Sequence, residues 1–128
     1  IKLNTQYMHT LRFSIGVQGR YSVKDILREF QKNKMIALTY KKSSNKIFSF
    51  GRDHGYYGRI FNQTVVPMES VLAVYDENTG TTRVSGFCFT PQDGNSLLTS
   101  MAAVSYGIHG DDYLEKMNFV DALLFNLI

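Results

Sequence analysis

The sequence predicts an α+β fold: a small, strongly curved antiparallel sheet or barrel, with one helix in the N-terminal half of the chain and two C-terminal helices. Three observations support this class. The chain has 128 residues, the size of one domain, and no linker or repeat divides residues 1–128. Short segments of alternating apolar and polar residues are separated by small turns. Apolar residues recur at helical spacing in one early segment and again near the C-terminus.

Two elements are expected in the first quarter of the chain. "YMHTLRFSIGV" (7–17) alternates as a strand does. "YSVKDILREFQKNK" (21–34) predicts a helix, because Ser22 can cap it and Asp25 follows three residues later. Its apolar residues fall on one helical stripe, made of Val23, Ile26, Leu27 and Phe30.

The middle of the chain predicts the rest of the sheet. "MIALTY" (35–40) alternates as a half-buried strand, "KKSSNK" (41–46) is a polar turn, and "IFSF" (47–50) resumes the strand pattern. Further strands are expected at "GYYGRIF" (55–61), "SVLAVYD" (70–76) and "TTRVSGFCF" (81–89), the last two joined through "ENTG" as a hairpin.

Helical character returns at the C-terminal end. "SLLTSMAAVSYG" (96–107) predicts one helix, and "DDYLEKMNFVDALLFNLI" (111–128) predicts a second that opens with two acidic residues. The second segment is nearly apolar all round in its last turns, so it must be buried. Two interpretations stay open: packing in the domain core, or an interface with a second copy or another protein that includes Leu123, Leu124 and Phe125.

Composition excludes several classes of protein. With 44% hydrophobic and 20% charged residues the chain is globular, and no apolar run approaches the roughly 18 residues that span a bilayer. We therefore expect no membrane partner and a cytoplasmic location. The single cysteine, Cys88, forms no internal disulfide and provides no zinc site, and the three histidines stand far apart in sequence. No metal and no cofactor are expected.

Charge is distributed unevenly along the chain. Residues 20–59 contain ten basic and three acidic side chains, whereas residues 60–128 contain two basic and eight acidic ones. A basic half favours a polyanionic partner, since neutralising phosphates releases condensed counterions. Two solvated faces of opposite sign would give the same totals.

The segment "FSFGRDHGYYGRIF" (48–61) combines glycines, arginines and aromatic rings. Gly51 and Gly55 suit a tight turn, which would place Arg52 and His54 at a loop tip. Aromatic faces stack on unpaired bases and arginine binds phosphate, so this composition favours single-stranded nucleic acid. The predicted nucleic-acid-binding residues are Lys41, Lys42, Lys46, Arg52, His54, Tyr57, Arg59 and Arg83. The alternative is a hairpin whose rings belong to the core.

No catalytic residue is assigned. A small metal-independent ribonuclease would need a base, an acid and a cation near the phosphate. The residues that would have to meet are His54, His109, Arg52, Arg59 and Tyr57. Their spacing gives no support for this. Cys88 lies in an apolar strand pattern, which favours a core residue over a nucleophile.

Two stretches resemble known families. "MIALTYKKSSNKI", followed after a gap by "VLAVYDENTGTTRVSGF", resembles the WYL-like, Sm-like barrel proteins of tailed bacteriophages. This resemblance implies an Sm-like barrel and a phage regulator of host or viral transcription or genome metabolism, acting in the host cytoplasm. It also implies a basic groove with Cys88 nearby, lined by Lys41, Lys42, Arg52, Arg59 and Arg83.

"TVVPMESVLAVYDENTG" (64–80) is similar to the β-core of the stringent-starvation adaptor family, which binds peptide degrons for an AAA+ protease. The acidic tail of that family is missing here. Two hypotheses for function follow: a nucleic-acid or nucleotide-binding accessory module, or a protein-binding adaptor or inhibitor that uses a sheet edge or the apolar C-terminal helix on a host protein. A homodimer is compatible with either.

Overall fold

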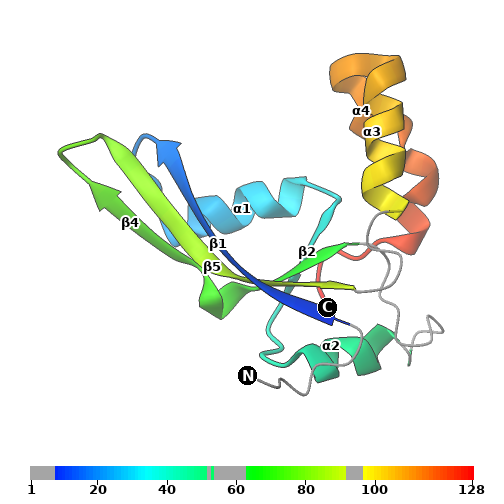
Figure 1. Cartoon of the computed structure of the whole chain (residues 1–128), viewed down its shortest axis with the longest axis horizontal. Coiled ribbons are helices and arrows are strands. Elements are labelled where there is room, and N and C mark those ends of the chain that lie inside the picture. Colours follow the sequence, from blue (N-terminus) through cyan, green and yellow to red (C-terminus); the bar gives the residue numbers. More distant parts are fainter. Residues whose placement is uncertain (1–7, 52, 54–62, 92–96) are drawn as a thin grey trace.

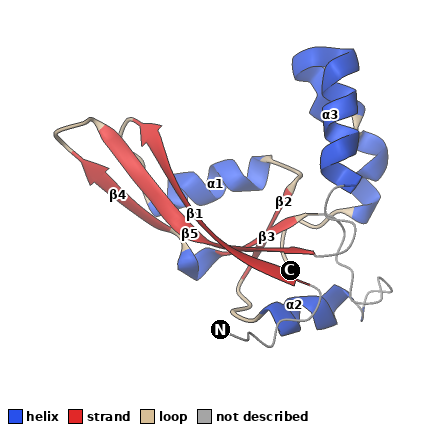
Figure 2. Ribbon diagram, viewed as in Figure 1, coloured by secondary structure: helices blue, strands red, loops and turns tan. Residues whose placement is uncertain are grey.

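The computed structural model describes residues 8–51, 53, 63–91 and 97–128 and confirms the α+β class. One open, twisted five-stranded sheet forms the centre of the molecule, with helices on both faces and a group of C-terminal helices at one end (Figures 1 and 2). The sheet is mixed, because one of its strand pairs is parallel and the others are antiparallel. It does not close into a barrel, because its edge strands do not meet.

Strand β5 (Thr81–Pro91) is the centre of the sheet. Strand β1 (Met8–Gln18) pairs with it antiparallel over its whole length, without a break in register. On its other side β5 pairs with β4 (Leu72–Asp76) and then with β3 (Thr64–Pro67), which are separated by the short 3-10 helix η2 (Met68–Ser70). Strand β2 (Ile36–Thr39) runs parallel to β3.

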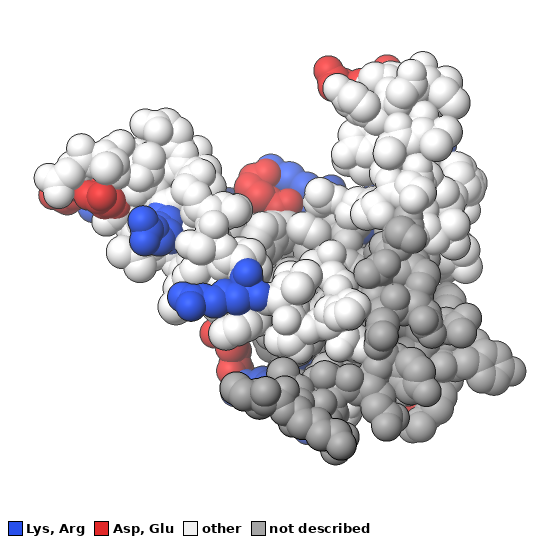
Figure 3. All heavy atoms as spheres, in the orientation of Figure 1, with Lys and Arg blue, Asp and Glu red and all other residues white. Residues whose placement is uncertain are grey.

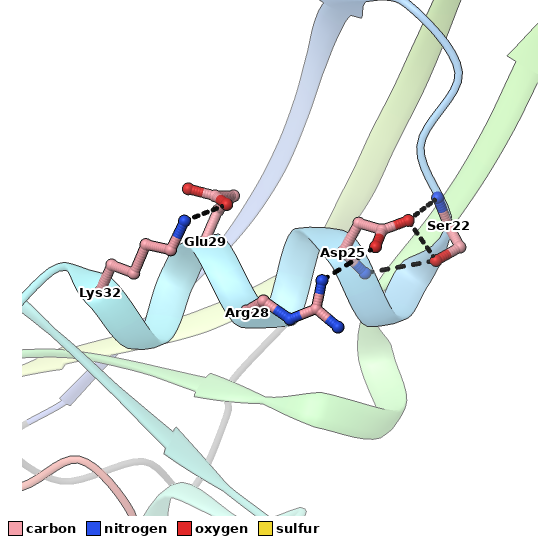
Figure 4. Close-up of polar contacts among 5 residues, drawn as sticks. All are labelled: Ser22, Asp25, Arg28, Glu29 and Lys32. Atoms are coloured by element: carbon pink, nitrogen blue, oxygen red, sulfur yellow. Dashed lines mark hydrogen bonds and ion pairs between the residues drawn. The ribbon is translucent and has the colours of Figure 1, made fainter.

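Helix α1 (Val23–Lys32) begins where the sequence predicts it. The Ser22 hydroxyl accepts a hydrogen bond from the Asp25 amide at 3.3 Å, and the Asp25 carboxylate accepts one from the Ser22 amide at 3.0 Å (Figure 4). This capping box satisfies two of the free amides of the first turn. The apolar stripe of α1 packs on the sheet, where Phe30 meets Phe13 edge-on.

Removal of the cap is expected to destabilise the fold in a pH-dependent way. Ser22→Ala should cost about 1 kcal/mol in urea unfolding at neutral pH. The hydrogen bonds from the Ser22 side chain and backbone lower the pKa of Asp25 below its ordinary value of 3.8. Stability from this carboxylate is therefore present above that value and is lost as the pH falls through the folded-state pKa. The stability gap between wild type and Asp25→Asn should shrink below about pH 3.8; a gap that is constant with pH would contradict this.

The strand predicted at 47–50 is wrong. Those residues lie in helix α2 (Ser44–Gly51), so the N-terminal half contains two helices. Ile47 is fully buried, and Phe48 and Phe50 pack beside it against the sheet residues Met8, Ala37, Val65 and Phe89. The predicted strand at 55–61 lies outside the described residues.

The C-terminal end forms an arm that stands away from the sheet (Figure 1). It contains α3 (Leu97–His109), the 3-10 helix η3 (Gly110–Asp112), the single turn α4 (Tyr113–Lys116) and the 3-10 helix η4 (Asn118–Leu123). The prediction of one helix over 111–128 is therefore wrong beyond α4. The last residues are extended because they pair with β2: the Leu38 amide donates to the Asn126 carbonyl, and the Ile128 amide donates to the Leu38 carbonyl, each at 2.9 Å.

Candidate nucleic-acid interface

The face of the sheet opposite α1 has a large exposed area. Side chains alternate along a strand, so the continuous β1–β5 and β4–β5 registers determine which residues share this face. We call its exposed part the open face; it consists of Arg12, Ser14, Gly16, Leu72, Val74, Arg83, Ser85 and Phe87. Its centre has only small side chains, and arginine and apolar side chains surround them.

Arg12 and Phe87 are direct cross-strand partners on the open face. Facing residues of an antiparallel pair have Cβ atoms roughly 5 Å apart, so the two side chains start from neighbouring points on this face. The Phe87 side chain is 48% exposed. Its backbone is held by Ser70 of η2, whose hydroxyl accepts from the Phe87 amide at 3.1 Å and donates to the Pro67 carbonyl at 2.8 Å. The break between β3 and β4 thus fixes the position of an exposed aromatic ring.

Beside Phe87 the surface is hollowed. This α2 hollow has a volume of about 570 Å³. Phe87, Phe89 and Pro67 provide its apolar lining, while the start of α2 and η2 add polar groups, among them Lys42, Ser43, Ser44, Asn45 and Glu69. Lys42 and Glu69 form an ion pair across it. Ser44 is only 6% exposed.

Three of the predicted basic residues do come together around the first turn of α2. Lys42 lines the α2 hollow, and Lys41 and Lys46 line a neighbouring hollow of about 360 Å³; Asn45 borders both. The Lys41 ammonium lies 4.9 Å from the centre of the Phe50 ring, a cation–π contact. These three lysines therefore lie near one another on the surface.

Arg83 lies on the open face but apart from the lysines. It lines a hollow of about 440 Å³ near the β4–β5 turn, together with Val74, Asp76, Thr79 and Thr81. Figure 3 accordingly shows lysine and arginine side chains over the sheet as separate groups. The other predicted residues, Arg52, His54, Tyr57 and Arg59, lie outside the described residues.

The predicted partner residues differ in accessibility. Leu123 is 53% exposed, but Leu124 packs into the core of the arm and Phe125 meets Phe50 edge-on at 5.4 Å. His109 is exposed at the end of α3. Cys88 is buried beneath the sheet on the α1 side, and burial raises the pKa of its thiol, which disfavours the nucleophilic thiolate.

The arm presents a different surface. No Asp, Glu, Lys or Arg occurs between Leu97 and Ile108, and Figure 3 shows mostly uncharged atoms over this region. Several large apolar side chains of the arm are more than half exposed: Leu97, Val104, Tyr106, Ile108, Phe119 and Leu123. The exposed apolar surface of the arm thus lies mainly on α3.

Among the residues with described positions, no three His, Cys, Asp or Glu side chains gather in a way that could hold a metal ion. Over the same residues, no helix combines the length and the apolar character needed to cross a membrane. The chain matches no protein-family model, no curated protein and no solved structure.

Proposed function

We propose that this protein binds single-stranded nucleic acid on the open face, as an accessory module and not as an enzyme. The observation that carries the proposal is the Arg12–Phe87 pair, an exposed aromatic residue and an exposed arginine that face each other across two strands. A base stacks on such a ring, and the arginine holds the adjacent phosphate.

The surroundings of this pair extend the path for a strand. Arg83 lies on the same face of β5 as Phe87, four residues earlier in the chain and roughly 13 Å away. Lys42 stands at the other side, at the border of the α2 hollow. The path therefore runs from Arg83 over Phe87 to Lys42, and Asp76 and Glu69 mark its acidic limits.

The α2 hollow can take one unstacked base next to Phe87. Its volume of about 570 Å³ lies within the roughly 300 to 1,000 Å³ range of small-molecule sites. The lining combines apolar surface with a few polar groups, and the Ser44 hydroxyl and the Asn45 amide can meet the edge of a base.

Phe87→Ala is expected to weaken binding of fluorescein-labelled oligo(dT) and oligo(rU) by roughly 5- to 150-fold, because it removes a stacking platform. Fluorescence anisotropy at low salt measures this. Phe119→Ala is the control, since it removes an exposed phenyl from the arm, away from the open face. Arg12→Glu should weaken binding and reduce the slope of log affinity against log salt by about one. No binding by the wild type at low salt, or equal affinities for Phe87→Ala and Phe119→Ala, would refute the proposal.

A second candidate function is a protein-binding adaptor that uses the arm. The uncharged helix α3, with Val104 63% and Ile108 70% exposed, favours it. Binding through such a surface should change little with salt, unlike phosphate binding. A partner captured from nuclease-treated host extract by the wild type, and lost with Val104→Lys plus Ile108→Lys but retained with Phe87→Ala, would support this function.

A further inference from the structure

Strand β1 is a long edge strand. It spans Met8–Gln18, and it pairs with β5 on one side and with no strand of the described structure on the other. The outer edge of such a strand presents unpaired amides and carbonyls, which proteins usually protect with charged side chains, proline or a bulge. β1 has no proline, its register with β5 has no bulge, and Arg12 is its one lysine or arginine.

Two apolar side chains lie along this edge on the α1 side of the sheet. Leu11 and Ile15 share a face with Phe13, which packs against Phe30 of α1. Both are nevertheless 49% exposed, and α1 packs mainly against β2 and β4. The sheet therefore ends in an apolar border beside unsatisfied backbone groups.

We propose that β1 pairs antiparallel with β1 of a second copy, around a two-fold axis at Phe13, to form one continuous sheet across the dimer. In this register Leu11 lies opposite Ile15 of the second copy, and Ile15 lies opposite Leu11. The partly exposed apolar side chains of both copies then cover one another. An isologous contact of this kind is closed, so it stops at two chains.

The charged residue selects among the possible registers. With the axis at Phe13, Arg12 faces Ser14 of the second copy. A shift that moves the axis to Arg12 would place two guanidinium groups opposite each other, which is destabilising. A shift to Ser14 would separate Leu11 from Ile15. A second copy fits this edge because it has the same length and the complementary pattern.

A charge-swap experiment tests both the dimer and its register. Leu11→Lys with Ile15→Lys places like charges opposite each other at two points and should give a monomer. Leu11→Lys with Ile15→Glu places opposite charges there and should restore a dimer that weakens at high salt. Within one chain the two positions lie roughly 13 Å apart, so the variants differ little as monomers. Sedimentation equilibrium gives the mass, and circular dichroism confirms that both variants fold.

The wild type should have twice the chain mass of 14.6 kDa. A monomer at all accessible concentrations, or the same mass for both variants, would overturn the proposal. If the variants do not fold, hydrogen exchange on the wild type decides: β1 amides should be better protected in concentrated than in dilute samples, and equal protection with a monomer mass would count against pairing. No nucleic acid is present in these measurements, so they succeed or fail independently of the proposed binding function.

Discussion

Gln63→Leu is expected to lower the free energy of unfolding by roughly 3 kcal/mol, because it removes three part-buried hydrogen bonds to the backbone at about 1 kcal/mol each. Gln63 is fully buried. Its amide nitrogen donates to the carbonyls of Lys34 and Phe125, and its amide oxygen accepts from the Phe125 amide, each at 2.9 Å. Gln63 immediately precedes β3. Its side chain thus ties this point of the chain to the segment before β2 and to the C-terminal segment.

Urea unfolding followed by circular dichroism measures this loss. Gln31→Leu is the matched control, since Gln31 is exposed on α1 and its replacement should change stability by no more than about 0.5 kcal/mol. Equal stabilities for the two variants would show that the hydrogen bonds of Gln63 contribute nothing. Gln63→Glu, which keeps one acceptor and loses the donors, should be nearly as damaging as the leucine variant.

Leu38→Ala is expected to cost roughly 2 to 5 kcal/mol, the range for truncating a leucine in a packed core. Leu38 is fully buried on β2, in the cluster that joins α1 to the sheet through Ile26, Val66 and Val84. The backbone bonds of Leu38 to the C-terminal segment remain possible in the variant, so the loss reports side-chain packing.

Leu72→Ala provides the control for this substitution. Leu72 is 59% exposed on β4, and the same truncation there leaves no internal cavity. The two variants should therefore differ in urea midpoint while sharing a similar slope. A cost at position 72 equal to that at position 38 would contradict the placement of the core.

Local signals in the sequence predicted the elements that depend on local chemistry. Ser22 and Asp25 identified the start of α1, and the strands β1, β2, β4 and β5 and the turn at 77–80 formed where alternation and turn residues indicated. The four-residue strand β3 was missed, because "TVVP" is a short apolar run that is buried by its neighbours β2 and β5. Such a run has no measurable period.

Two errors arose where tertiary contacts decided the conformation. "IFSF" alternates over four residues only, which fits a strand and one helical turn equally well. Packing of Ile47 and Phe50 against the sheet and Phe125 selected the helix. At the C-terminus, hydrogen bonds to Leu38 and Gln63 hold residues 125–128 extended, although their composition favours a helix.

The candidate site was predicted only in part. Clustering in sequence identified Lys41, Lys42 and Lys46, which the first turn of α2 keeps together. Arg12 and Phe87 were not selected, since they are 75 positions apart and become neighbours only through the β1–β5 register. Pattern analysis of one strand cannot provide a register with a distant strand.

The long separation between β1 and β5 also has a consequence for biosynthesis. The paired residues are 63 to 83 positions apart, from Gln18–Thr81 to Met8–Pro91. At roughly 5 to 20 residues per second, β1 is synthesised roughly 3 to 17 seconds before the residues with which it pairs. During that interval both of its edges are open, and Leu11, Phe13 and Ile15 have no sheet to join. Pausing or slow codons between these strands should therefore increase co-translational aggregation, whereas the same changes after Pro91 should have little effect.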